Sequence, residues 1–263
     1  MVTTELKLWL EKEWKKYIPL VLFFLFIIYK TYTFNKDEGG GVSVIQCLYT
    51  MLKGSFAPDI DIDNTSFVRI PYLYLIFNMY IIYIFSYYPF KNMKNIDIQF
   101  ILRHQNRNKW WIGKCIWSIF SIISFYVLGL IMFLITDLIN RNILNKKVND
   151  NLIHEYTNKL SNKRIIIIVI TAIIISISIH MLQMVISVVF SKMAALITII
   201  FLYIISIYKS GHLLLGNYLM ILRYISLDGK MAVNEYTGMI VGVGLIVLSI
   251  IVGCVFVKKV EYI

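Results

Sequence analysis

The chain has 263 residues, of which 59% are hydrophobic and only 16% are charged, and its mean hydropathy is +0.71. This balance excludes an ordinary water-soluble domain, because a soluble fold of this length needs charged residues on the outer face of nearly every helix. The 26 Lys and Arg residues outnumber 15 Asp and Glu residues, but they lie beside apolar runs, so we expect contact with anionic lipid and no nucleic acid.

An amphipathic stretch opens the chain over residues 3–16. Trp9 and Trp14 share a face with leucines while most charged residues lie elsewhere, which is typical of a helix at the membrane interface. Apolar runs of spanning length then recur, which predicts a single all-α integral membrane domain over residues 1–263 with six transmembrane helices. The spans are expected at about residues 17–34, 70–88, 111–138, 165–189, 193–208 and 239–257.

Two further apolar pieces are too short to cross a membrane. Residues 42–52 lie inside a polar loop over residues 35–68, and we expect them to form a helix on the outer surface. Residues 213–225 are broken by Gly216 and Asn217 and end near Arg223, which favours a re-entrant hairpin before the last span.

The small residues of the last span share one helical face. Gly238 and Gly242 are four residues apart, and Ser249 and Gly253 continue roughly the same face. Such a face permits close approach of a neighbouring helix, and we expect packing within the chain rather than a dimer contact.

The strongest topological signal lies at residues 90–114, where six Lys and Arg residues face only Asp97. The positive-inside rule puts this loop in the cytoplasm, and with six spans both termini lie there too. The basic loop at residues 139–164 is then expected outside, which departs from the simple rule. These features predict a multi-pass protein of the cell membrane.

Catalytic motifs are missing from the sequence. It contains no phosphate-binding loop ending in Gly-Lys-Ser or Gly-Lys-Thr, no His-Glu-x-x-His and no Gly-x-Ser-x-Gly. The three cysteines are far apart and have no metal-binding spacing. We therefore expect no catalytic residue, metal or cofactor in this chain, and no enzymatic activity of its own.

Polar side chains in two of the spans form a candidate substrate path. Ser176, His180 and Gln183 step along one face of the fourth span, where they either line a path or hydrogen-bond to neighbouring helices. The second span carries a tyrosine stripe that either contacts a substrate or forms interfacial aromatic belts. The tyrosines of this stripe that we assign to the path are Tyr80, Tyr83 and Tyr87.

The basic cytoplasmic loop contains a short potential helix from Ile96 to His104. It either docks a cytoplasmic partner or supplies charge that sets the topology and contacts anionic lipid. The residues that we assign to a docking surface are Ile96, Gln99, Phe100, Arg103, His104, Arg107 and Lys109.

This order of parts resembles the type 2 ABC exporter permeases over the whole chain. The most specific residues are the basic run from Arg103 to Lys109, followed by Trp110, Trp111 and Lys114, and the terminal Lys258 and Lys259. In size and composition the chain is similar to small permeases of low-GC Gram-positive bacteria, including those of phenol-soluble modulin export and of bacteriocin export or immunity. The long outer loop over residues 35–68 has no counterpart that we can match to that family.

The resemblance implies a permease subunit of an ATP-driven exporter. Two permease subunits, identical or related, would bind two separate ATPase subunits through the amino-terminal helix and the 96–109 loop. ATP and Mg²⁺ would bind only in those partners. The implied substrate is an amphipathic peptide or another hydrophobic compound, exported from the cytoplasm or inner leaflet. The alternative function is that of a membrane scaffold or assembly protein without transport.

Overall fold

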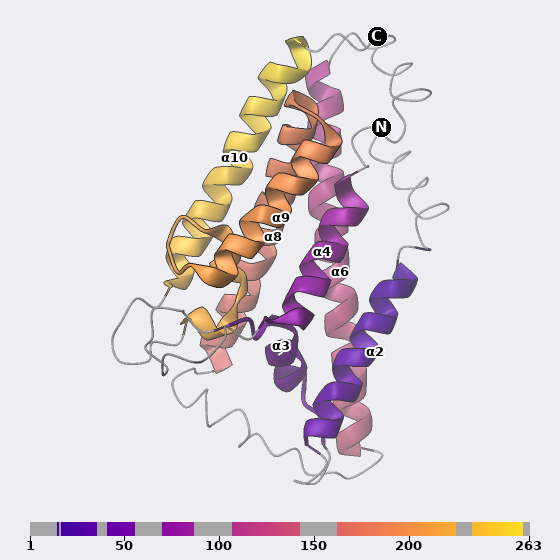
Figure 1. The fold of residues 1–263 in the computed structure, drawn as a ribbon. Helices are drawn as coiled ribbons and strands as arrows, with labels where there is room; N and C mark the ends of the chain where they lie inside the picture. Colours follow the sequence, from indigo (N-terminus) through magenta and orange to yellow (C-terminus); the bar gives the residue numbers. More distant parts are fainter. Residues whose placement is uncertain are drawn as a thin grey trace.

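The computed structural model describes residue 15 and residues 17–35, 41–55, 70–86, 107–142, 162–224 and 233–259. Within these ranges the protein is all-α, with seven α-helices and two short 3-10 helices. They are α2 (Tyr17–Phe34), α3 (Val44–Leu52), α4 (Tyr72–Ser86), α6 (Arg107–Asn142), α8 (Asn162–Val189), α9 (Lys192–Tyr208), η5 (Leu215–Leu219), η6 (Ile221–Tyr224) and α10 (Glu235–Lys259). Figure 1 shows the long helices running side by side as one bundle.

Each range expected to span the membrane coincides with a helix. Four helices, α2, α6, α8 and α10, are long and apolar enough to cross a membrane. The other two, α4 and α9, are apolar but shorter, with 15 and 17 residues. The expected amino-terminal helix with Trp9 and Trp14, residues 96–106 of the basic loop, and Tyr87 lie outside the described residues.

The central helix of the bundle is α8. It packs against α4, α6, α9, α10 and η5. Of the most apolar 18-residue stretch of α8, 67% of the residues are buried inside the protein. The corresponding share is 22% for α2 and for α10. The prediction treated the spans alike, whereas the tertiary structure separates one core helix from peripheral helices whose apolar faces are exposed.

The glycines of α10 permit close packing within the chain, as the sequence predicted. A Cβ atom on Gly242 would lie 2.7 Å from Ile174 of α8, and one on Gly253 would lie 2.0 Å from the Trp111 ring of α6. Ser249 on the same face is buried. These contacts hold α10 along α8 and against α6.

The predicted short helix in the first loop is present as α3. It begins with a capping box, in which Ser43 and Gln46 each accept a hydrogen bond from the other's backbone N–H. The helix is packed more deeply than one resting on the membrane surface, because Cys47 and Met51 are buried. Its contacts with α2, α4 and α6 explain this burial.

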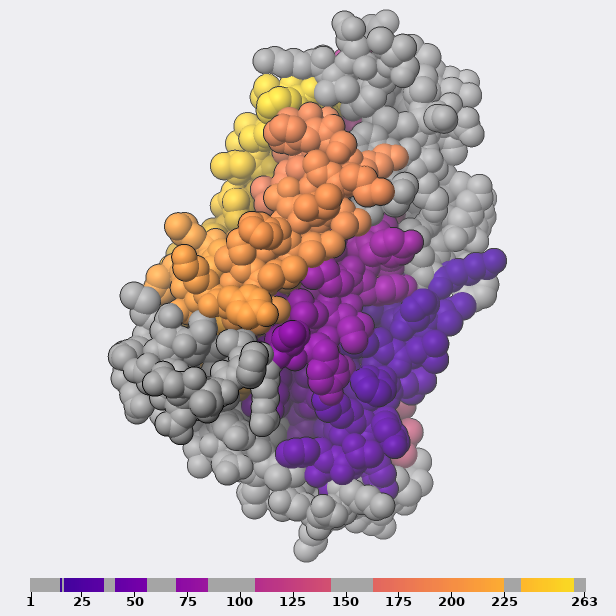
Figure 2. All heavy atoms as spheres, viewed as in Figure 1, coloured from indigo at the N-terminus to yellow at the C-terminus, as the bar shows by residue number. Residues whose placement is uncertain are grey.

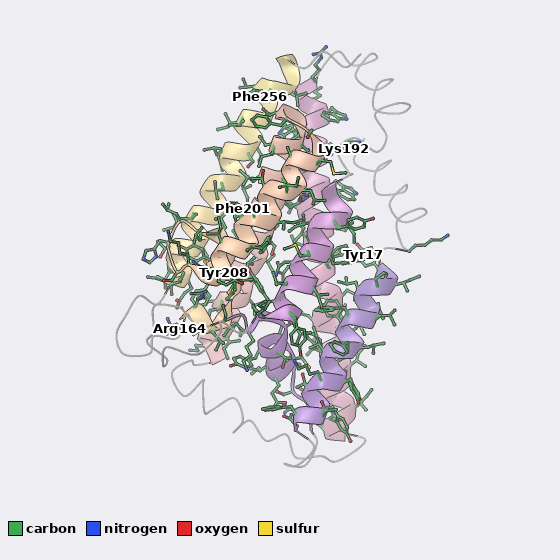
Figure 3. All side chains as sticks on the ribbon, in the orientation of Figure 1. Tyr17, Arg164, Lys192, Phe201, Tyr208 and Phe256 are labelled. Carbon is green, nitrogen blue, oxygen red and sulfur yellow. The ribbon has the colours of Figure 1, made fainter. Side chains whose placement is uncertain are left out.

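The segment expected to be a re-entrant hairpin forms the two short helices η5 and η6. Every residue from Leu215 to Tyr224 is buried, and η5 contacts α8, α9 and α10. We call α3, residues 53–55, η5 and η6 together the cap, because they gather toward the same end of the bundle (Figure 1). Lys192 marks the other end, where α9 begins (Figure 3).

Candidate functional site

The polar face of α8 points into the bundle. Ser176, His180 and Gln183 are all buried. The Ser176 hydroxyl lies 2.8 Å from the phenol oxygen of Tyr126 on α6. Gln183 donates to the backbone oxygen of Ile82 on α4 at 3.1 Å. The stripe therefore links α8 to two neighbouring helices through hydrogen bonds.

His180 belongs to this same face. Its Nδ1 atom lies 3.4 Å from the Gln183 side-chain oxygen, one helical turn away. The packing alternative stated for this stripe explains these contacts directly, because a polar group inside an apolar bundle is costly unless it has a partner.

The tyrosine stripe of α4 does not face the α8 stripe. Tyr83 is 66% exposed and Tyr72 is 49% exposed, while Tyr80 is half-buried. Lys30 of α2 donates to the Tyr72 hydroxyl and its ammonium group lies over the same ring. Among the described residues of the predicted path, the exposed Tyr83 of α4 therefore lies apart from the buried polar face of α8.

The inward face of α4 carries polar groups that the sequence analysis did not assign to a site. The Asn78 side chain donates to the Tyr74 backbone oxygen and accepts from the Tyr203 hydroxyl of α9 at 3.3 Å. Tyr74 donates to the backbone oxygen of Gly216 in η5 at 3.0 Å. A polar residue in the middle of an apolar run is a usable signal for such inward positions, because it avoids lipid.

The cap is organised around Arg223, which is only 2% exposed. Its Nη2 atom donates to the backbone oxygens of Ser206 and Ile207, at 3.1 and 2.8 Å, at the end of α9. These carbonyls lie in the last turn of α9, where the helix leaves acceptors without an intrahelical partner and where a cation is favoured. The same atom donates to the Ser55 hydroxyl at 3.4 Å.

Further side-chain bonds satisfy the irregular backbone of the cap. Asn217 donates to the backbone oxygens of Lys209 and Gly211. Tyr224 donates to the backbone oxygen of Tyr218 at 2.8 Å. Sequence patterns did not reveal these partners, since they depend on which carbonyls the turns bring together.

The start of α10 is tied to α8 beside the cap. Arg164 forms an ion pair with Glu235, with the Nε atom 2.9 Å from the carboxylate. Figure 3 shows Arg164 at the end of the bundle opposite Lys192. This pair places the first turn of α10 against the start of α8.

The predicted docking surface is described only where it enters α6. Arg107 is the first residue of α6 and is half-buried, and Lys109 is exposed. The adjacent Trp110, Trp111 and Lys114 are fully buried within the bundle. Lys109 is therefore a charged side chain at this end of α6 that a partner could reach.

The residues brought together here are chiefly alcohols, phenols and amides in hydrogen-bonded pairs, an arrangement suited to fixing helices. Within the described ranges, His, Cys, Asp and Glu form no group of three that could hold a metal ion. The fold and these contacts define an all-α protein with several helices able to cross a membrane.

Residues 23–263 match the family described as "Protein of unknown function (DUF2705)", and the chain belongs to this family. Comparison with the curated proteins and with the solved structures found no match.

Proposed function

We propose that this protein is the permease subunit of an ATP-driven ABC exporter that moves amphipathic peptides or other hydrophobic compounds out of the cell. The observation that carries the proposal is the order of elements along the chain. A basic segment follows α4 and leads directly into α6, and a buried irregular segment precedes α10. That order is the one on which the resemblance to type 2 exporter permeases rests.

Six membrane crossings form part of the proposal. The described part of α4 has 15 residues and α9 has 17. At 1.5 Å per residue they measure about 22 and 26 Å, which falls short of a hydrocarbon core about 30 Å thick. The cap lies at the ends of these two helices and supplies the missing depth, with η5 and η6 as the re-entrant segment.

The burial of the cap supports this assignment. Backbone that is not α-helical is tolerated at membrane depth only where protein surrounds it and its polar groups have partners. The residues of η5 and η6 are buried, and two carbonyls of η5, those of Gly216 and Tyr218, accept hydrogen bonds from Tyr74 and Tyr224.

The proposed topology puts both termini in the cytoplasm and the cap outside. The segment from residue 90 to residue 114 carries the net positive charge that favours the cytoplasmic side. The start of α6 and the end of α10 lie at the end of the bundle away from the cap (Figure 1), so both would face the cytoplasm.

The partners would be two ATPase subunits and a second permease subunit, identical or related. The ATPases would bind the segment from Ile96 to Lys109 and the amino-terminal helix with Trp9 and Trp14. They would supply ATP and Mg²⁺, and their closure would drive the permease pair between two arrangements. Arg107 and Lys109 extend this surface into the first turn of α6.

A membrane scaffold without transport is the second candidate, and a specific observation favours it. The polar face of α8 is engaged in bonds to α4 and α6. Side chains used in this way fix the bundle rather than line a path. Under this reading the basic segment would bind a partner that has no nucleotide site.

The test is purification of the full chain in mild detergent, followed by identification of the copurifying proteins and an ATPase assay. We expect an ATPase subunit with a phosphate-binding loop. The paired charge reversal Arg103→Glu with Arg107→Glu should reduce its recovery at least fivefold without preventing membrane insertion. The matched control reverses Lys146 and Lys147 in the loop on the opposite side and should leave recovery unchanged.

Two outcomes would contradict this proposal. Recovery of a partner without any nucleotide site would favour the scaffold. Equal recovery of the ATPase with the reversed and the native basic segment would remove residues 103–107 from the docking surface.

A further inference from the structure

Two parts of the cap meet although they are far apart in sequence. Residues 53–55 leave α3, whereas residues 220–223 form the end of the η5 and η6 segment. Leu222 donates its backbone N–H to the Lys53 backbone oxygen at 3.1 Å. This backbone hydrogen bond pairs one particular residue of each segment, so it fixes how the two segments are aligned.

The approach at this contact is unusually close at Gly54. This residue has a φ of +68°, in the left-handed region that favours glycine. A Cβ atom at Gly54 would lie 2.4 Å from the Met220 Cβ, so no larger residue fits. Met220 itself is fully buried.

Within the described part of the chain, the Ser55 side chain also contacts residues of the η5 and η6 segment. The Ser55 hydroxyl lies 3.8 Å from the Met220 sulfur and accepts from Arg223 at 3.4 Å. By contrast, Arg223 binds two carbonyls of α9 at shorter distances, so it is held more firmly on its own side. Ser55 is buried under these contacts.

At one end of the bundle the contact links two groups of helices, which also pack on each other directly, α6 against α8 and α10 and α4 against α8 and α9. On one side α3 packs against α2, α4 and α6, and on the other η5 packs against α8, α9 and α10. Figure 2 shows α2, α4 and α9 side by side on one face, so the early and late halves of the chain adjoin there. A joint of one backbone hydrogen bond, one long side-chain hydrogen bond and a sulfur contact separates more readily than the apolar packing within each group.

We propose that residues 53–55 and 220–223 form a latch that holds the cap end of the bundle closed and that opens as a unit. As a device of the exporter cycle the latch rests on the proposed function, in which the cap end faces the outside. Its opening would expose Ser55 to solvent while Cys47, buried in α3 away from the contact, stays protected.

The test measures thiol labelling in the full chain. Cys115 and Cys254 are replaced by serine, Ser55→Cys is introduced, and the native Cys47 serves as the internal reference. The protein is placed in lipid nanodiscs, which leave both faces accessible, and its reaction with a fluorescent maleimide is followed by mass spectrometry.

Weakening the latch should raise labelling at position 55 alone. We expect Met220→Ala to increase the rate at position 55 at least fivefold and to leave Cys47 unchanged. The matched control Met184→Ala removes an equally buried methionine from α8 and should change neither rate. An unchanged labelling rate at position 55 would overturn the latch, because the contact would then hold nothing closed. An equal rise at Cys47 would also overturn it, because the whole cap would then have loosened.

A second arm separates the latch from the proposed function. In the complex with its copurified ATPase, MgATP should raise labelling at position 55 at least fivefold relative to ADP. An ATPase-bound complex in which MgATP changes nothing would overturn the latch and leave the exporter proposal standing. If no ATPase copurifies but Met220→Ala acts as expected, the exporter proposal fails and the latch stands as a joint of this chain.

Discussion

The helical bundle and the cap are held together by different forces. In the bundle, apolar helices approach closely where a side chain is small, as at Gly242 and Gly253. In the cap, short turns are held by side chains that donate to backbone oxygens, with Arg223 and Asn217 as the main donors. A helix satisfies its own backbone and needs only a matching surface, whereas irregular backbone needs a partner for each buried polar group.

The largest effect should come from filling the closest helix contact. Gly253→Ala would put a methyl group into the Trp111 ring and should lower the free energy of unfolding by about 3 kcal/mol, at the upper end for overpacked cores. Gly244→Ala is the matched control on the same helix, where a Cβ meets nothing within 4 Å. It should be neutral or slightly stabilising, because alanine is the better helix former.

The melting temperatures of both glycine variants are measured in detergent, with size-exclusion chromatography as the readout of unfolding. Equal melting temperatures for the two variants would show that α10 does not pack on α6 through Gly253. Close packing at this glycine would then no longer distinguish the bundle from the cap.

A smaller loss is expected from the cap. Arg223→Met keeps much of the volume but removes the donor to Ser206 and Ile207, which should cost about 2 kcal/mol because buried acceptors lose their partner. Arg141→Met is the control, since the Arg141 side chain is 56% exposed in its ion pair with Asp137. Surface pairs of that kind contribute at most about 1 kcal/mol.

Limited proteolysis at the cap would sharpen this prediction. We expect Arg223→Met to increase cleavage near the cap before it lowers the melting temperature of the bundle. Simultaneous loss of both would show that cap and bundle unfold as one unit.

The smallest effect should follow substitution in the polar stripe of α8. Gln183→Met preserves the length of the side chain but removes the bond to Ile82, and hydrogen bonds between membrane helices contribute roughly 1 kcal/mol. Ser187→Ala is the control, because Ser187 bonds within its own helix to Met184. Melting temperatures should therefore fall for the first variant and stay close to native for the second.

This third prediction also discriminates between packing and a substrate path. If the proposed ATPase copurifies, a Gln183→Met protein with native stability but altered ATP hydrolysis in that complex would assign the stripe to transport. Lower stability with normal hydrolysis would keep Gln183 as a contact between α8 and α4.

Much of the fold follows from local sequence. Apolar runs predicted the positions of the long helices, the short apolar piece at residues 42–52 predicted α3, and the small face of α10 predicted close packing. These features depend on properties that each segment carries by itself, namely length, polarity and periodicity.

The candidate site was less predictable. Ser176, His180 and Gln183 share one buried face of α8, whereas Tyr83, assigned to the same path, is exposed on α4. The sequence did not reveal that the Trp111 ring is buried against α10, where Gly253 leaves room for it. Periodicity predicts which residues share a face, but it does not say which neighbour that face meets.

The sequence by itself determined that this protein is an all-α chain with several helices suited to a membrane, because apolar length and helical backbone satisfaction are local properties. Only the tertiary structure decided that α8 is the core helix, that Arg223 closes the end of α9, and that the turn at Gly54 meets Met220. These are contacts between segments distant in sequence, and they exist only once the helices are packed.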